Sequence, residues 1–142
     1  AASTVAARPE DIFLSGVNAN GHVLVADEPE SYGGENRGPS PYDFLTASLG
    51  TCTAMTLNMY ARRKQLPLEM VEITVSHDRI HARDCEDCES DSGRIDVLTR
   101  EIHLTGDLDE AQRQRMLEIA DRCPVHKTLE NEIRVRSTLK DS

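Results

Sequence analysis

The longest stretch of the chain without a charge covers residues 44–61, inside the segment Ser40–Lys64. A clear helix start signal precedes it. The signal is a serine cap, a proline at the first helical position and an acid three residues after the cap: Ser40, Pro41 and Asp43. Three consecutive cations close the segment and suit the negative end of a helix dipole. The pattern predicts one long helix with Cys52 buried at its middle.

Eighteen uncharged residues approach the roughly 20 apolar residues that cross a bilayer. This stretch is too polar for lipid, because seven hydroxyl, amide or glycine positions interrupt it: Thr46, Ser48, Gly50, Thr51, Thr53, Thr56 and Asn58. We therefore expect a helix with protein on most of its sides.

Short apolar runs precede this helix. Ile12–Leu14 and His22–Val25 flank the segment Asn18–Gly21, and Asn-Gly between such runs is typical of a hairpin turn. Residues 1–10 are small and polar and predict a frayed terminus. The segment Asp27–Gly38 is a glycine-rich acidic loop that leads to the helix, and its one base lies three residues before the helix cap.

Five further elements follow the long helix: strands at Val71–Ile80, Ile95–Leu104 and Ile133–Leu139, and helices at residues 107–122 and 124–130. The strands alternate with period two, and the first two are joined by an acidic turn, which is most simply an antiparallel hairpin. The first helix carries an apolar stripe. It must stop near Cys123, because Pro124 disfavours helical backbone in the residue before it. The same proline can open the second, shorter helix.

Length and composition limit the possible classes of protein. With 142 residues and no repeat or linker, the chain predicts a single α+β domain, residues 1–142. Its 25 acids against 16 bases argue against nucleic acid and anionic membrane surfaces as partners. Apolar residues make up 38% of the chain, a thin supply that predicts a homodimer in which a second subunit completes the core. Four scattered cysteines and no visible signal peptide or anchor indicate a reducing, cytoplasmic compartment.

Cys123 stands directly before a proline-started helix, so its thiol would face unpaired backbone N–H groups that favour the thiolate. Arg122 and His126 could add positive charge. Taken alone, Cys123 is more simply a cap or core filler, and Cys52 a small core residue. Both, however, lie on helices expected to pack against the sheet, where they could approach within the roughly 4.4–6.8 Å between Cα atoms that a disulfide needs. Two such thiols suit a peroxidatic and resolving pair.

Cys85 and Cys88 form a C-x-x-C at the tip of the predicted hairpin, among five acids. Negative neighbours disfavour a nucleophilic thiolate, so we do not interpret the motif as thioredoxin-type. The same field attracts a cation, and zinc held by both cysteines and a histidine would fit ligand chemistry. The candidate histidines are His81, His77 and His103. A solvated loop and a labile local disulfide are the alternatives.

Two motifs, GGENRGPSPYDFLTASLGTC and DRCPVHKTL, together resemble the OsmC/Ohr family, the osmotically induced protein C and organic hydroperoxide resistance proteins. In that family a proline starts the central helix, which carries one cysteine, and a second cysteine belongs to a Cys-Pro motif. Here Pro41 and Cys52 are eleven residues apart, as in the family, and Cys123-Pro124 supplies the second motif. The likeness covers roughly Ile12–Leu139. It is greatest to OsmC-like domains fused behind α/β-hydrolase domains, which a chain that begins with alanine would suit.

The resemblance implies an OsmC-like α+β fold, with antiparallel sheets, a long central buried helix and a second amphipathic helix, in an intertwined homodimer. It also implies a peroxidase for organic hydroperoxides, and for hydrogen peroxide as a further candidate, in which Cys52 is peroxidatic and Cys123 resolving. An external dithiol regenerates such an enzyme, and no metal, haem or flavin is required. The helix-terminus argument places the stronger thiolate at Cys123, and here we follow the family. The alternative is a non-catalytic dimeric module that binds a small molecule or a metal.

The chain departs from the family pattern at two places. The better-studied hydroperoxide reductases place a glutamate ten residues before the first cysteine, where this chain has Tyr42, with Asp43 one residue further on. They also carry an arginine in the first hairpin, whereas residues 12–25 contain none. Arg37 is then the nearest candidate to activate the thiolate. The predicted catalytic set is therefore Cys52, Cys123, Arg37 and Asp43.

Overall fold

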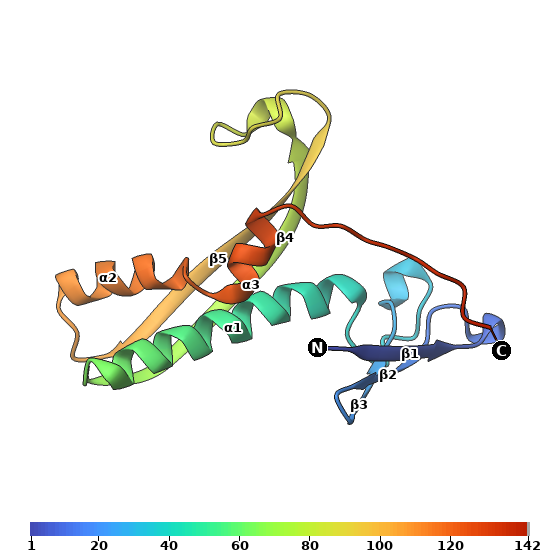
Figure 1. Ribbon diagram of the computed structural model, residues 1–142, viewed down its shortest axis with the longest axis horizontal. Helices are drawn as coiled ribbons and strands as arrows, with labels where there is room; N and C mark the ends of the chain where they lie inside the picture. The colour runs from blue at the N-terminus through green and yellow to red at the C-terminus, as the bar shows by residue number, and fades with distance from the viewer. Residues whose placement is uncertain (142) are drawn as a thin grey trace. The chain divides into compact units, whose positions relative to one another are not determined.

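The computed structural model describes residues 1–141, and it divides into two compact units, Ala1–Ala47 and a second that begins at Ser48. The first unit holds a three-stranded antiparallel sheet, and the second holds a two-stranded antiparallel sheet with helices (Figure 1). The predicted α+β class with antiparallel sheets is thus confirmed. Among the described residues, no helix is long and apolar enough to cross a membrane.

The sheet of the first unit contains β1 (Ser3–Ala7), β2 (Ser15–Ala19) and β3 (His22–Ala26), in the order β1-β2-β3. The predicted Asn-Gly turn joins β2 to β3, with φ angles of 54° at Asn20 and 86° at Gly21. Both angles are positive, as the tight turn of a two-residue hairpin requires. This hairpin is therefore confirmed.

Two expectations for the start of the chain are wrong. The segment expected to be frayed contains β1, which pairs with the whole of β2. All five side chains of β1 are exposed, so its backbone ladder, and no apolar pattern, holds it in place. Ile12–Leu14 is not a strand, because it follows the 3-10 helix η1 (Pro9–Asp11) and leads into β2. The first hairpin of the chain is consequently β1–β2.

The loop after β3 is organised around the carboxylate of Asp27, which is only 3% exposed. It accepts hydrogen bonds from the backbone N–H groups of Glu28 (2.8 Å), Glu35 (3.2 Å) and Arg37 (3.2 Å). A Cβ atom at Gly38 would lie only 2.2 Å from the carbonyl oxygen of Val25, so this position of the loop requires glycine. The loop includes the 3-10 helix η2 (Glu30–Tyr32).

The predicted long helix is α1 (Pro41–Arg63). Its capping box is confirmed, since the N–H of Asp43 donates to Ser40 Oγ (3.3 Å) and the N–H of Ser40 donates to Asp43 Oδ2 (2.9 Å). The fully buried positions follow one narrow stripe, namely Leu49, Thr53, Leu57 and Ala61. Met55 and Met59 are 64% and 72% exposed. The expectation that protein surrounds this helix on most of its sides is therefore wrong for the single chain.

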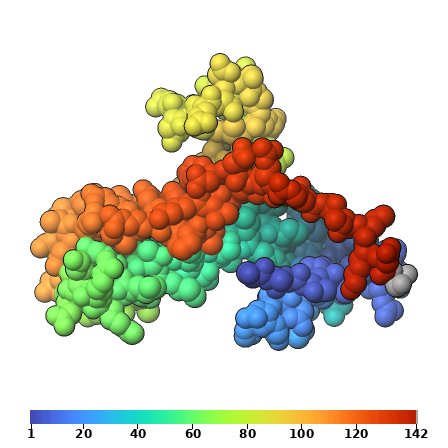
Figure 2. Space-filling model, viewed as in Figure 1, coloured from blue at the N-terminus to red at the C-terminus, as the bar shows by residue number. Residues whose placement is uncertain are grey.

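The second unit is built on a long ribbon of β4 (Leu68–His81) and β5 (Arg94–Gly106). The amphipathic helix is α2 (Glu110–Ala120), and α3 (Pro124–Glu130) follows it, both as predicted. A core joins α1 and α2 and rests on the ribbon: Leu57, Ala61, Met116, Ile119 and Ala120, with Val71, Ile73, Ile102 and Leu104 packed against it. The ribbon tip projects beyond the helices (Figures 1 and 2).

The predicted strand at Ile133–Leu139 is wrong, because these residues form no strand in the described chain. Its apolar side chains remain in solvent, and Val135 and Leu139 are 88% and 99% exposed. An alternating pattern becomes a strand only when its backbone groups pair with those of another strand, and this segment pairs with neither sheet.

Candidate functional site

The N-terminus of α3 forms one half of the candidate site. Pro124 occupies the first helical position and Cys123 is the cap residue, as predicted. The backbone N–H of His126 donates to the Cys123 sulfur at 3.3 Å. Cys123 is fully buried, so the sulfur receives this donor away from water.

Cys52 of α1 supplies the other half. The backbone N–H of Val125, in the first turn of α3, donates to the Cys52 sulfur at 3.4 Å. The Cys52 and Cys123 thiols are also hydrogen-bonded to each other, and both cysteines are free. Cys52 is partly exposed, so it is less buried than the sequence predicted. The fold thus brings the two predicted cysteines together as a dithiol, with one accessible and one buried sulfur.

The two thiols differ in their tendency to ionise. Burial raises the pKa of Cys52, and the hydrogen bond and charge of Cys123 raise it further, against the Val125 N–H. Burial also opposes ionisation of Cys123, but donors from Cys52, the His126 N–H and Thr53 outweigh it and lower the pKa of Cys123. The stronger thiolate is therefore at Cys123, as the helix-terminus argument predicts, while access from solvent favours Cys52.

Arg100 of β5 connects the two halves of the site. Its guanidinium donates to Thr53 Oγ1 at 3.0 Å and to Asp121 Oδ1 at 2.8 Å, and its side chain is only 11% exposed. Thr53 in turn donates to the carbonyl of Leu49 at 2.7 Å. Arg100 therefore ties α1, beside Cys52, to the turn between α2 and α3, beside Cys123.

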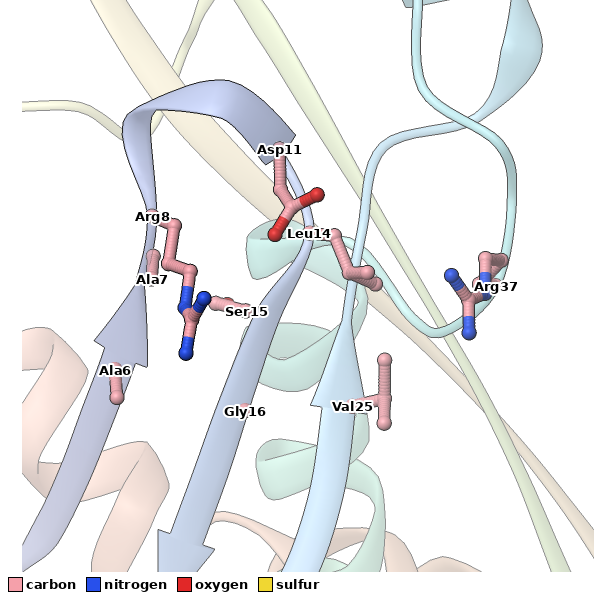
Figure 3. Close-up of a pocket in the computed structure, with 9 residues that line it drawn as sticks. All are labelled: Ala6, Ala7, Arg8, Asp11, Leu14, Ser15, Gly16, Val25 and Arg37. Atoms are coloured by element: carbon pink, nitrogen blue, oxygen red, sulfur yellow. The ribbon is translucent and has the colours of Figure 1, made fainter.

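The other predicted catalytic residues belong to the first unit. Asp43 caps α1 through the hydrogen bonds described above, so its carboxylate has a structural partner. Arg37 lines a cavity of about 470 Å³ in the first unit, together with Arg8, Asp11 and Ser15 (Figure 3). Arg37 also lies 4.0 Å from the carboxylate of Glu35.

Sequence reasoning missed Arg8, which lies between β1 and η1, in the connection of the first hairpin. The sequence analysis looked for an arginine at residues 12–25, whereas the first hairpin of the structure is β1–β2, whose connection contains Arg8. The sequence also carried a signal for Arg100, because it is a charged residue at an inward position of β5, between Leu98 and Ile102.

At the ribbon tip, Cys85 and Cys88 are joined by a disulfide, one of the alternatives that the sequence left open. The possible ligand atoms of Cys85, Asp87 and Cys88 lie within 4.8 Å of one another, and His81 does not belong to this group. His77 instead pairs with Asp96 at 2.8 Å. Zinc binding would first need reduction of the disulfide, and Asp87 would then be the third ligand where the sequence analysis expected a histidine. Zinc binding by Cys85, Cys88 and Asp87 stays a prediction.

A cavity of about 910 Å³ lies between the ribbon tip and the helices of the second unit. Cys85 and Cys88 line it on one side. Arg100 and His126, which contact the dithiol site, line it on the other. The link between this cavity and the dithiol is His126, which lines the cavity and donates its backbone N–H to the Cys123 sulfur.

A dithiol held between a capped central helix and a proline-started helix defines a thiol-based α+β protein. Comparison with known proteins agrees with this class. The chain belongs to the OsmC-like protein family, whose model matches residues 33–138. No curated protein matches the chain.

Solved structures show the same fold at low identity. An OsmC-like protein from Mycoplasma pneumoniae is 20% identical with a TM-score of 0.66, covering 91% of this chain and 86% of its own. An organic hydroperoxide resistance protein OsmC from Legionella pneumophila is 18% identical with a TM-score of 0.64, covering 90% and 87%. The organic hydroperoxide resistance protein OhrB of Bacillus subtilis is 18% identical with a TM-score of 0.61, covering 89% and 87%.

Proposed function

We propose that the chain is a thiol peroxidase that reduces organic hydroperoxides, and hydrogen peroxide as a further substrate. The observation that carries this proposal is the hydrogen-bonded pair of an accessible Cys52 and a buried Cys123 with a lowered pKa. Proteins of similar fold are named for organic hydroperoxide resistance, which supports a role in the response to peroxide stress.

In the first step Cys52 attacks the terminal oxygen of the peroxide, because it is the sulfur that a substrate can reach. The Cys123 thiolate accepts the Cys52 proton through the hydrogen bond between them. The O–O bond breaks, Cys52 becomes a sulfenic acid, and the proton passes to the leaving alkoxide to give the alcohol. Cys123 thus acts first as a base, which reconciles its lower pKa with attack by Cys52.

In the second step the Cys123 thiolate attacks the sulfenic sulfur of Cys52, and the leaving hydroxide takes up a proton from solvent to become water. The net reaction is ROOH + 2 RSH → RSSR + ROH + H₂O, with both thiols from the same chain. An external dithiol, as a reducing cytoplasm supplies, then regenerates the pair. None of these steps requires a metal, haem or flavin.

Arg8 is the residue we assign to charge stabilisation of the peroxide oxygens, in place of Arg37. Its position in the β1–β2 connection fits the arginine that the family resemblance requires. A guanidinium suits this task because it stays charged and donates several hydrogen bonds in one plane. Asp43 is a positioning residue that fixes the start of α1.

The working form is a homodimer in this proposal. Met55 and Met59 leave an apolar face of α1 exposed, and Val135 and Leu139 are more exposed still. Leu49 of the same helix is already buried within the chain. The second subunit would therefore cover α1 beyond Leu49 and pair with the extended segment at residues 133–139.

Saturable turnover tests the proposal. Reduced protein with dithiothreitol should consume cumene hydroperoxide catalytically, and Cys52→Ser should abolish the turnover. A protein that binds small molecules without consuming peroxide would instead be the dimeric binding module, and the peroxidase proposal would be wrong.

A further inference from the structure

The acidic ribbon tip carries a second cysteine pair that the proposed peroxidase cycle does not use. Cys85 and Cys88 border the same cavity as Arg100 and His126, and these two residues contact the site of the first pair. The tip beyond the ribbon is closed by a neck in which the Ala82 N–H donates to the Gly93 carbonyl at 2.8 Å. The tip pair thus borders a cavity that reaches His126, the residue whose backbone N–H donates to Cys123.

We propose that the Cys85–Cys88 pair is an internal relay, which accepts electrons from an external dithiol and passes them to the Cys52–Cys123 disulfide of the same chain. The inference rests on the proposed function, because it supplies the reducing half of that cycle. It requires the ribbon tip to close over the cavity.

Apolar surface favours this closure, and charge adds little to it. Acids line the tip side of the cavity, among them Asp84, Glu86 and Asp87. On the other side Arg100 of β5 already pairs with Asp121 at 2.8 Å, and His126 lies beside Glu130. Apolar side chains of α2 and α3 line the same space, and closure would remove them from water: Leu117 and Leu129.

The direction of electron flow follows from which thiolates are stabilised. A disulfide is a strong oxidant when its reduced form is stabilised, as backbone donors stabilise the Cys123 thiolate. The acids around Cys85 and Cys88 do the opposite, because they repel a thiolate and so disfavour the reduced, ionised pair. Electrons should therefore pass from Cys85 and Cys88 to Cys52 and Cys123.

The relay consists of two thiol–disulfide exchanges. Cys88 attacks as the thiolate, because Asp87 Oδ1 lies 3.2 Å from the Cys85 sulfur and holds the proton there in the reduced pair. The attack is on Cys52, the accessible sulfur, and Cys123 leaves as the thiolate that His126 stabilises. Cys85 then gives up its proton and attacks Cys88, and Cys52 leaves and takes up a proton. Two electrons and one proton have moved, since Cys88 begins and Cys123 ends as a thiolate, and the Cys85–Cys88 disulfide is restored.

A cross-linking experiment tests the contact without using peroxide. Cys85→Ser with Cys123→Ser leaves only Cys52 and Cys88, and diamide should join them within one chain, with a loss of two hydrogens and a Cys52–Cys88 peptide. The matched control, Cys88→Ser with Cys123→Ser, should give clearly less of the Cys52–Cys85 product. Absence of the Cys52–Cys88 disulfide, while the wild type forms Cys52–Cys123 under the same conditions, overturns the relay. A Cys52–Cys88 bond only between two chains overturns its intrachain form, and preferred cross-linking of Cys85 overturns the assignment of Cys88.

A redox equilibrium tests the direction. Wild-type protein with both disulfides formed by diamide receives one equivalent of dithiothreitol per chain, and peptide mapping locates the remaining disulfide. It should be at Cys85–Cys88 in about a ten-fold excess over Cys52–Cys123, the ratio for a potential difference of roughly 30 mV. An excess at Cys52–Cys123 overturns the relay, and neither result depends on whether the protein turns over peroxide.

Discussion

The sulfurs of Cys52 and Cys123 are hydrogen-bonded to each other, yet each receives its backbone donor from a different residue of the same helical turn. Val125 donates to Cys52 at 3.4 Å and His126 donates to Cys123 at 3.3 Å. The first turn of α3 therefore holds both sulfurs. Because Pro124 starts this turn, the Cys-Pro motif positions Cys52 as well as its own Cys123.

The first prediction concerns the coupling of the two pKa values. In Cys123→Ser, Cys52 loses the hydrogen bond and the charge that raise its pKa, and retains burial and the Val125 N–H. The pKa of Cys52 should therefore fall below its wild-type value. In Cys52→Ala, Cys123 loses a donor and its pKa should rise. Thiolate absorbance against pH, measured with Cys85 and Cys88 replaced by serine, checks both directions, and unchanged values would contradict the hydrogen-bonded pair.

The second prediction concerns Arg100, which bridges Thr53 and Asp121. Arg100→Met removes two hydrogen bonds, one of them charge-assisted, and should lower the free energy of unfolding by about 1–3 kcal/mol. Arg100→Lys keeps the charge but lacks the planar fork, so its loss should be intermediate. Urea unfolding measures both variants. Equal stability of wild type and Arg100→Met would show that the bridge does not stabilise the site.

The third prediction concerns the pH dependence of the loop before α1. Burial alone would raise the pKa of Asp27, but the N–H groups of Glu28, Arg37 and Glu35 lower it below the ordinary value of 3.8. A lowered folded pKa stabilises the protein above pH 3.8, and this contribution is lost as the pH falls through the folded pKa. Asp27→Asn should therefore be less stable than wild type at neutral pH, and the difference should shrink in acid. Thermal unfolding across pH measures it.

Glu35→Gln is the matched control for that series, because its carboxylate belongs to the same loop but is 78% exposed. It should leave the stability curve close to that of wild type. A loss of stability for Asp27→Asn that is the same at every pH would contradict the role given to the carboxylate charge.

The fourth prediction distinguishes the two arginines that line the cavity in Figure 3. If Arg8 stabilises charge on the peroxide oxygens, Arg8→Gln should lower kcat/KM for cumene hydroperoxide by about 100-fold, the usual effect of losing one such donor. Arg37→Gln should have a much smaller effect. The reverse order would return the catalytic role to Arg37.

The fifth prediction concerns assembly. Light scattering at micromolar concentration should give twice the chain mass of 15.8 kDa. Met55→Asp with Met59→Asp places two charges on the exposed face of α1 and should shift the protein toward the monomer. A wild-type monomer would contradict the homodimer.

Local signals in the sequence predicted the elements whose stability is local. The capping box of Ser40 and Asp43, the Asn20-Gly21 turn and the proline start of α3 each satisfy their own backbone groups within a few residues. Elements that depend on distant partners were harder to predict. β1 has an exposed, small-residue sequence and exists through its ladder with β2. Ile133–Leu139 has the pattern of a strand but pairs with no strand of the described chain.

The candidate site shows the same division. Cys52 and Cys123 could be predicted because a helix, a proline and a spacing mark them. The inward position of Arg100 follows from the alternation along β5, but its partners Thr53 and Asp121 depend on how β5 packs against the helices. The hairpin that carries Arg8 was predicted at the wrong residues.

The central claim is that Cys52 reacts with peroxide and Cys123 resolves it. Protein with Cys85 and Cys88 replaced by serine, reduced and treated with one equivalent of cumene hydroperoxide, should lose two hydrogens, and peptide mapping should place the new disulfide between Cys52 and Cys123. In a variant with Cys85, Cys88 and Cys123 replaced by serine, dimedone should trap a sulfenic acid on Cys52. A variant with Cys52, Cys85 and Cys88 replaced by serine, which keeps Cys123, should show no trapping. Trapping at Cys123 when Cys52 is absent would contradict these roles, and no reaction at either cysteine would contradict the peroxidase itself.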